Sequence, residues 1–290
     1  FPVESPFYAG TSLPYHYGLD LLVGLMEKLR FRIDLALNFI SALAFAMLLL
    51  GIYLMAQEIF GKSRVLGIVS VILFLFSSDL GYLDYLKKIP LGINSLINLW
   101  RIPDYLHQGP FNGSIISLFF ALNVYLNQSH LIVALAINIW LIYYFLRMIR
   151  TKSKFKIGNL MILGILFSFT SRLHSLIFIA SLFIILQLFV YFKSNRINYY
   201  FLLFAVLFSA PHLLQIWQQK SGNTASIFFF GFLTPEPVNI LSFVKFWFWN
   251  KGLAMILIPL CYLITDQRQR KIFIAFFSLF FMANLFKLSF

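Results

Sequence analysis

The sequence has few charged residues and a single cysteine. Only 11% of its 290 residues are charged and 60% are hydrophobic, whereas about 25% of residues in an average soluble domain are charged. A soluble fold of this length could not cover so much apolar surface, because a large share of its residues would still contact water. The lone Cys261 excludes a disulfide framework and a cysteine-based metal site. We therefore expect an all-α, polytopic membrane protein.

Signature motifs of soluble enzymes are also absent from the sequence. It contains no P-loop, no glycine-rich dinucleotide motif, and no HExxH, GxSxG or CxxC. There is no signal-peptide pattern, and Phe1 opens within a polar stretch. We expect the chain to be an internal piece of a longer protein.

Eight apolar stretches come close to the length of about 20 residues that a helix needs to cross a bilayer. They are residues 36–56, 65–83, 128–147, 157–171, 174–192, 198–213, 252–265 and 272–288. The fourth and seventh are short, and would extend into their flanks or lie where the bilayer is thin. The pattern predicts about eight transmembrane helices within one transmembrane domain, residues 1–290.

Lysine and arginine gather in four short loops between these stretches. The loops hold about half of the 23 basic residues, and they are 57–64, 147–156, 193–197 and 265–271. The positive-inside rule predicts that they are cytoplasmic, so both ends of the chain face outward. Most acidic residues fall on the other side, with the long loops 1–35, 84–127 and 214–251. The net charge of +13 therefore indicates orientation in a cell membrane, and nucleic acid is excluded as a partner.

The outer loops contain further expected elements. Residues 18–29 place several leucines near one helical face and are too short to span, which predicts a helix on the membrane surface. Segment 112–127 is interpreted as a surface or re-entrant helix, because a full span there would invert every later loop. Loop 214–251 is rich in proline and aromatic residues, and is either a structured lid or an interfacial anchor.

The order of these features matches a known pattern. PFYAGTSLPYHYGLDLLVGLMEKL (6–29) and SALAFAMLLLGIYLMAQEIFGKSRVLG (41–67) form an outer loop, a surface helix and a span that ends in an aromatic–glycine turn. Further similar segments are YLNQSHLIVALAI (125–137), FWFWNKGL (246–253) and NLFKLSF (284–290). In this order they resemble the GT-C superfamily, membrane glycosyltransferases that use polyprenyl-phosphate sugars and include the protein mannosyltransferase and lipid A aminoarabinose transferase branches.

The resemblance implies transfer of a sugar from a polyprenyl-phosphate donor to an acceptor on the outer face of the membrane. It also implies a catalytic acid in the first outer loop, which we expect upstream of Phe1; within this sequence the catalytic candidates are Asp79 and Asp20. Cationic side chains, or a divalent metal ion, would stabilise the departing phosphate. The residues expected to bind substrate are His16, Asp104, Arg172, His174, Lys245 and Lys287.

Other interpretations stay open for both the residues and the protein. Arg172 could snorkel to the lipid headgroups, and His130 could cap or pack at a helix end. A transporter or flippase of lipid-linked or small polar substrates is the first alternative function. A polysaccharide polymerase and a structural membrane subunit are the others.

Overall fold

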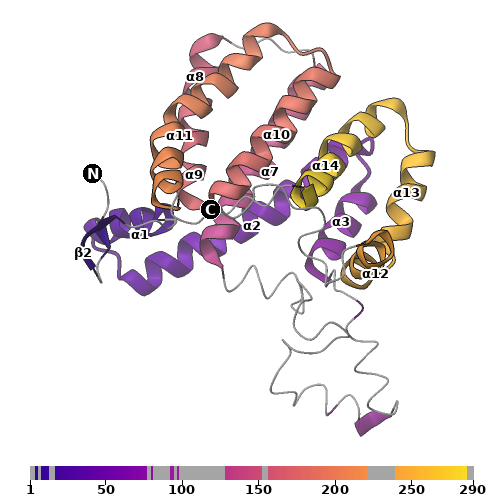
Figure 1. Ribbon diagram of the computed structural model, residues 1–290, viewed down its shortest axis with the longest axis horizontal. Coiled ribbons are helices and arrows are strands. Elements are labelled where there is room, and N and C mark those ends of the chain that lie inside the picture. Colours follow the sequence, from indigo (N-terminus) through magenta and orange to yellow (C-terminus); the bar gives the residue numbers. More distant parts are fainter. Residues whose placement is uncertain are drawn as a thin grey trace. The chain divides into compact units, whose positions relative to one another are not determined.

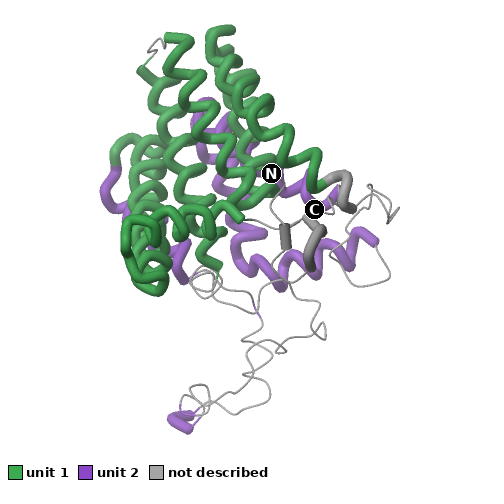
Figure 2. The backbone as a smooth tube through the Cα atoms, turned by 90° about the vertical axis from the view of Figure 1, so that its left-hand side faces the viewer, with its two compact units in different colours: residues 1–62, 128–225, 288–290 green, residues 63–127, 226–287 purple. Residues whose placement is uncertain are grey.

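The computed structural model describes residues 4–5, 8–12, 17–76, 80, 92–94, 97, 128–151, 156–220 and 239–285. These residues form helices and one short antiparallel pair of strands (Figure 1). The expectation of an all-α protein is confirmed for them, apart from that pair. The chain divides into two compact units, which Figure 2 colours separately. Unit 1 comprises residues 1–62, 128–225 and 288–290, and unit 2 comprises residues 63–127 and 226–287.

Unit 1 begins with the strands and a short helix and continues into a set of packed helices. Its elements are β1 (Glu4–Ser5), β2 (Tyr8–Ser12), α1 (Gly18–Lys28), α2 (Ile33–Ile59), α7 (Ser129–Thr151), α8 (Ile157–Ser168), α9 (Thr170–Leu173), α10 (Ser175–Tyr191), the 3-10 turn η1 (Arg196–Asn198) and α11 (Tyr199–Lys220). The surface helix predicted for 18–29 is thus a helix, α1. Leu19 and Val23 of this helix are buried against the rest of unit 1, whereas Leu25 and Leu29 are exposed.

Helices α2 and α7 run parallel. The indole Nε1 of Trp140 donates to the carbonyl of Met47 at 2.8 Å, and further along both helices Arg150 forms an ion pair with Glu58 at 3.0 Å. Gly51 lets the helices approach closely, since a Cβ there would lie 3.2 Å from Trp140 Nε1. Small residues commonly mark close helix contacts in membranes.

Helix α10 runs in the same direction as α7. The rings of His130 and His174 lie 5.8 Å apart near the starts of these helices. Phe145 and Phe189 lie 5.0 Å apart near their ends. Since the partners advance together along both helices, α2, α7 and α10 share one direction (Figure 1).

Helices α8, α9 and α11 run in the opposite direction. Gly164 of α8 lies against the backbone of Phe201 near the start of α11. The ring centroids of Phe201 and Phe145 are 4.8 Å apart. Further along, Arg172 of α9 is within electrostatic range of His212 of α11. Residues 57–62, 147–151 and 193–196, which are rich in lysine and arginine, therefore gather at one end of unit 1. We call this the basic end.

Unit 2 contains α3 (Arg64–Phe76), α12 (Ile240–Lys251), α13 (Ala254–Ile264) and α14 (Gln267–Leu285). Helix α12 starts with a capping box between Asn239 and Ser242, and its Trp247 donates from Nε1 to Asn284 Oδ1 of α14 at 3.0 Å. Helices α12 and α13 meet at 90° around Gly252. The φ of +55° at Gly252 explains the glycine, because a side chain is strained in this conformation.

The structure corrects the predicted number of membrane spans. Among the described residues, three helices are long and apolar enough to cross a membrane, and a fourth span results if the bent pair α12–α13 counts as one. They are Ile33–Ile59, Ser129–Thr151, Arg196–Ile216 and the pair Ile240–Lys251 with Ala254–Ile264. The prediction of about eight spans is therefore wrong, although an all-α membrane protein remains the class that these helices define.

Fewer spans are found than predicted because an apolar run in the sequence can be longer than the helix that forms within it. Helix α3 has 13 residues, and thus reaches about 20 Å of the roughly 30 Å hydrocarbon core. The run at 174–192 is a helix of 17 residues. The run at 252–265 is bent away from α12 and has 11 helical residues. Helix α14 opens on basic residues, which shorten its apolar part.

Candidate functional site

Polar and ionisable side chains gather at the end of unit 1 where α7 and α10 begin, opposite the basic end. We call this the polar end. Its members come from five elements or their caps, and they are Tyr17, Asp20, His130, Arg172, His174, Ser175 and His212.

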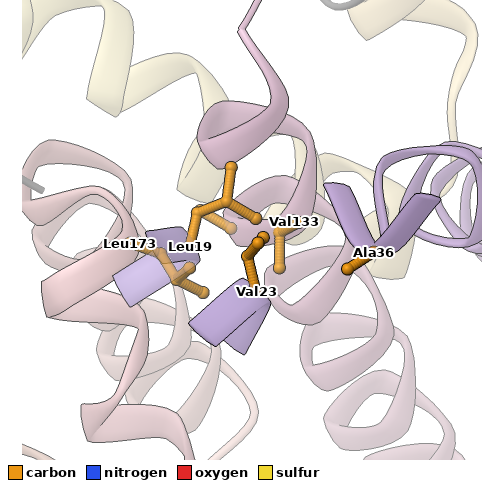
Figure 3. Close-up of a cluster of buried hydrophobic side chains, with 6 residues drawn as sticks. Leu19, Val23, Ala36, Val133 and Leu173 are labelled. Carbon is orange, nitrogen blue, oxygen red and sulfur yellow. The ribbon is translucent and has the colours of Figure 1, made fainter. Parts of the chain in front are cut away.

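Helix α1 lies directly against the backbone of α9. A Cβ on Gly18 would lie 2.9 Å from the carbonyl carbon of Arg172 and from the amide nitrogen of Leu173, so only glycine fits here. An apolar cluster fixes the same contact (Figure 3). The buried residues of this cluster are Leu19, Val23, Ala36, Val133, Ala134 and Leu173. Glycine and the cluster together hold Tyr17 and Asp20 next to α9.

The chain breaks between α9 and α10 at His174, whose φ of −164° and ψ of 101° are extended. Before the break, Ser168 Oγ donates to the Ile165 carbonyl at 2.6 Å, and Ser171 Oγ donates to the Ser168 carbonyl at 2.7 Å. The buried Thr170 makes the equivalent bond to Phe167. Such hydroxyl bonds to the preceding turn favour helix bends, so the hydroxyl-rich sequence explains the break locally.

The ring of His174, at this break, stacks on the ring of His130 from the start of α7. The rings of His130 and His174 are 5.8 Å apart with an interplanar angle of 16°. Asp20, which is exposed on α1, is within electrostatic range of His130. A carboxylate and an imidazole from two helices thus face the same end of the unit.

A third histidine is buried beside them. His212 is 4% exposed, and its ring meets the ring of Tyr17 edge-on with centroids 5.5 Å apart. The backbone of Ser171 is within hydrogen-bonding range of the ring and the guanidinium of Arg172 is nearby, yet neither ring nitrogen makes a hydrogen bond of good geometry within the described residues. A buried polar ring without hydrogen bonds is uncommon in native structures, so its position calls for an explanation.

The structure brings together three of the residues predicted from sequence, Asp20, Arg172 and His174. Lys245 lies elsewhere, exposed on α12 in unit 2. The other candidates, His16, Asp79, Asp104 and Lys287, lie outside the described residues.

The site residues predicted from sequence did not include Ser175 and His212. His212 follows Pro211 inside an apolar run, and an ionisable residue in such a run is itself a signal of function. Ser175 has no comparable signal, because many serines occur in apolar helices. The described residues hold no group of three or more His, Cys, Asp or Glu side chains arranged for a metal ion.

An apolar groove lies along α2 and α7. Its volume is about 520 Å³, and its walls include Ile40 and Met47 of α2, Trp140 and Tyr144 of α7, and Leu163 of α8. Its lining is almost entirely apolar, so it suits an alkyl chain better than a sugar.

No protein-family model, curated protein or solved structure matches this chain. The fold by itself defines the class, an all-α membrane protein with three to four candidate spans among the described residues.

Proposed function

We propose that the protein is a membrane glycosyltransferase that moves a sugar from a polyprenyl-phosphate donor to an acceptor at the outer face of the membrane. The observation that supports this most is the convergence of Asp20, Arg172 and His174 on one end of unit 1, opposite the basic end. Since lysine and arginine favour the cytoplasmic side, the polar end then faces outward.

The proposed reaction needs groups of the kinds found at the polar end. The acceptor oxygen bonds to the anomeric carbon of the sugar while the bond from that carbon to the phosphate oxygen breaks. A carboxylate takes the proton of the acceptor hydroxyl, and Asp20 is the described acid in position for this. The leaving polyprenyl phosphate gains negative charge, which the guanidinium of Arg172 stabilises.

The apolar groove on α2 and α7 supports a lipid-linked substrate. Its walls belong mainly to Ile33–Ile59 and Ser129–Thr151, two of the candidate spans. A molecule bound in the groove would therefore lie at the depth of the lipid tails. A polyprenyl chain is apolar throughout and has the chemistry that this lining accepts.

The experiment is a transfer assay on the purified full-length protein in nanodiscs, with a panel of polyprenyl-phosphate sugars and acceptors. We expect Asp20→Asn and Arg172→Gln to lower kcat by about 100-fold or more. Glu27→Gln is the matched control, because Glu27 is exposed on the same helix as Asp20. Unchanged transfer in both Asp20→Asn and Arg172→Gln would contradict the proposed site, and no transfer from any donor would contradict the function.

A transporter or flippase is the second candidate, and a buried amide supports it. Asn138 is 2% exposed in the middle of α7, and its Oδ1 makes no hydrogen bond within the described residues. The bent pair α12–α13 is also of the broken-helix type that transporters use. Loss of substrate flux in Asn138→Ala, with no sugar transfer detectable in the wild type, would favour this function.

A further inference from the structure

The start of α10 offers hydrogen-bond donors that the helix itself does not use. The first amide bonded in the helical pattern is that of Phe178, which donates to the carbonyl of His174 at 3.1 Å. The N–H groups of the three preceding residues, 175–177, therefore have no partner in the helix. His174 at the N-cap provides no side-chain hydrogen bond to them.

A buried hydroxyl lies in the same turn. Ser175 is 0% exposed, and its Oγ makes no hydrogen bond within the described residues. A hydroxyl in this state is costly, because burial removes its bonds to water without replacing them. The other buried hydroxyls of this region, on Ser168, Thr170 and Ser171, all donate to backbone carbonyls. Ser175 thus differs from them in having no hydrogen-bond partner among the described residues.

A cation and a second unsatisfied group flank this turn. Arg172 is three residues before Ser175, is only partly exposed, and forms no salt bridge within the described residues. His212 lies beside Arg172 and within hydrogen-bonding range of the Ser171 backbone, but its buried ring nitrogens make no hydrogen bond of good geometry among the described residues. A guanidinium, a hydroxyl, an imidazole and free amides are together rich in donors and short of acceptors.

We propose that the break between α9 and α10 binds a phosphate group. The guanidinium of Arg172, the hydroxyl of Ser175 and the first amides of α10 donate to its oxygens, and His212 lines the site. A helix start with free amides and an arginine is a common arrangement for phosphate recognition. The site holds whether or not the protein transfers sugars, and the phosphate belongs either to a lipid headgroup or to a free anion.

The experiment measures binding of two probes to the full-length protein in phosphatidylcholine nanodiscs. The first probe is inorganic phosphate, and the second is hexadecyl phosphate, with hexadecanol as its uncharged counterpart. We expect Arg172→Gln and Ser175→Ala each to weaken binding of the phosphate probe by about 10- to 100-fold. Ser181→Ala is the control, because Ser181 is buried further along the same helix.

The stability of the unliganded protein provides a second measurement. Since the Ser175 hydroxyl has no partner, Ser175→Ala should leave the unfolding temperature unchanged or raise it, which separates a lost ligand contact from a damaged fold. A clear fall in the unfolding temperature of Ser175→Ala without ligand would overturn the proposal.

Each binding outcome either supports or overturns the proposed phosphate site. Tight binding of hexadecyl phosphate alone supports the site and assigns it to a lipid headgroup, while binding of both probes supports it as a site for free phosphate. Binding of neither probe, equal binding of hexadecanol, or binding that both variants leave unchanged overturns it. Phosphate binding without any sugar transfer retains this site and contradicts only the transferase.

Discussion

The Nε of Arg150 lies 3.0 Å from Oε1 of Glu58 and joins the last turn of α7 to the last turn of α2. The Glu58 side chain is only 3% exposed, whereas that of Arg150 is 35% exposed. A buried carboxylate is costly without cationic and hydrogen-bonding partners. The pair therefore fixes how far α2 and α7 are shifted along each other at the basic end.

Removing Arg150 should destabilise the protein. We expect Arg150→Gln to lower the free energy of unfolding by about 1–3 kcal/mol, because it takes a partner from a buried carboxylate. The control is Arg147→Gln, since Arg147 is exposed on the same helix and, among the described residues, its side chain bonds only to the nearby Tyr143 hydroxyl. Denaturant unfolding in detergent micelles measures both variants. Equal stability of the two would show that the ion pair contributes little.

Replacing each of the two glycines of α1 by alanine should change stability in opposite directions. In Gly18→Ala the new Cβ meets the backbone of α9 at 2.9 Å, and backbone cannot rotate away, so we expect a loss of about 1–3 kcal/mol. In Gly24→Ala the Cβ meets nothing within 4 Å, and alanine's helix propensity should raise stability by up to about 1 kcal/mol. Thermal unfolding and proteolysis of α1 test this, and a stable, protease-resistant Gly18→Ala would contradict the contact.

A second glycine pair tests the packing of α8 on α11. Gly164→Ala places a Cβ 2.8 Å from the carbonyl oxygen of Phe201, which should separate the two helices and lower stability by about 1–3 kcal/mol. Gly158→Ala on the same helix meets nothing within 4 Å and should be neutral. Differential scanning calorimetry of both variants provides the measurement. The packing shown here is wrong if Gly164→Ala unfolds at the temperature of Gly158→Ala.

In unit 2, the hydrogen bond from Trp247 to Asn284 should stabilise the contact of α12 with α14. Trp247→Phe removes the donor and leaves a buried amide oxygen with less hydrogen bonding, at a cost of about 1–3 kcal/mol. Trp249→Phe is the control on the same helix, because its side chain makes no hydrogen bond in the described residues. Tryptophan fluorescence during denaturant unfolding can follow each variant, and a larger loss for Trp249→Phe would contradict this assignment.

The class of fold could be predicted from the sequence more accurately than the number of membrane spans. Hydropathy locates α2 and α7 well, because both are long apolar helices without internal breaks. It also separates the runs 157–171 and 174–192 and begins a run at 252, where the structure has the α9–α10 break and the bend at Gly252. It does not predict that α3, α10 and α13 are too short to count as spans. Charge patterning placed the basic residues near 57–62, 147–151 and 193–196 on one side. The helix directions in unit 1 gather them at one end.

The candidate site could be predicted only in part. Arg172 and His174 were identifiable, because charged and ionisable residues within an apolar stretch are expensive and seldom accidental. The proximity of Asp20 to His130 was not predictable, since it depends on Gly18 seating α1 against α9. The unsatisfied hydroxyl of Ser175 is likewise a property of packing, and no pattern in a single sequence reveals it.

The shared direction of α2, α7 and α10 has an electrostatic consequence for the whole of unit 1. Every helix has a macrodipole equivalent to about half a positive charge at its start and half a negative charge at its end. With the short α1 set aside and α8 and α9 counted as one helix, three helices start at the polar end and two end there. The sum leaves roughly half a positive charge at the polar end and the same negative charge at the basic end. The backbone field therefore favours anions at the polar end and lysine and arginine at the basic end, before any side chain is counted.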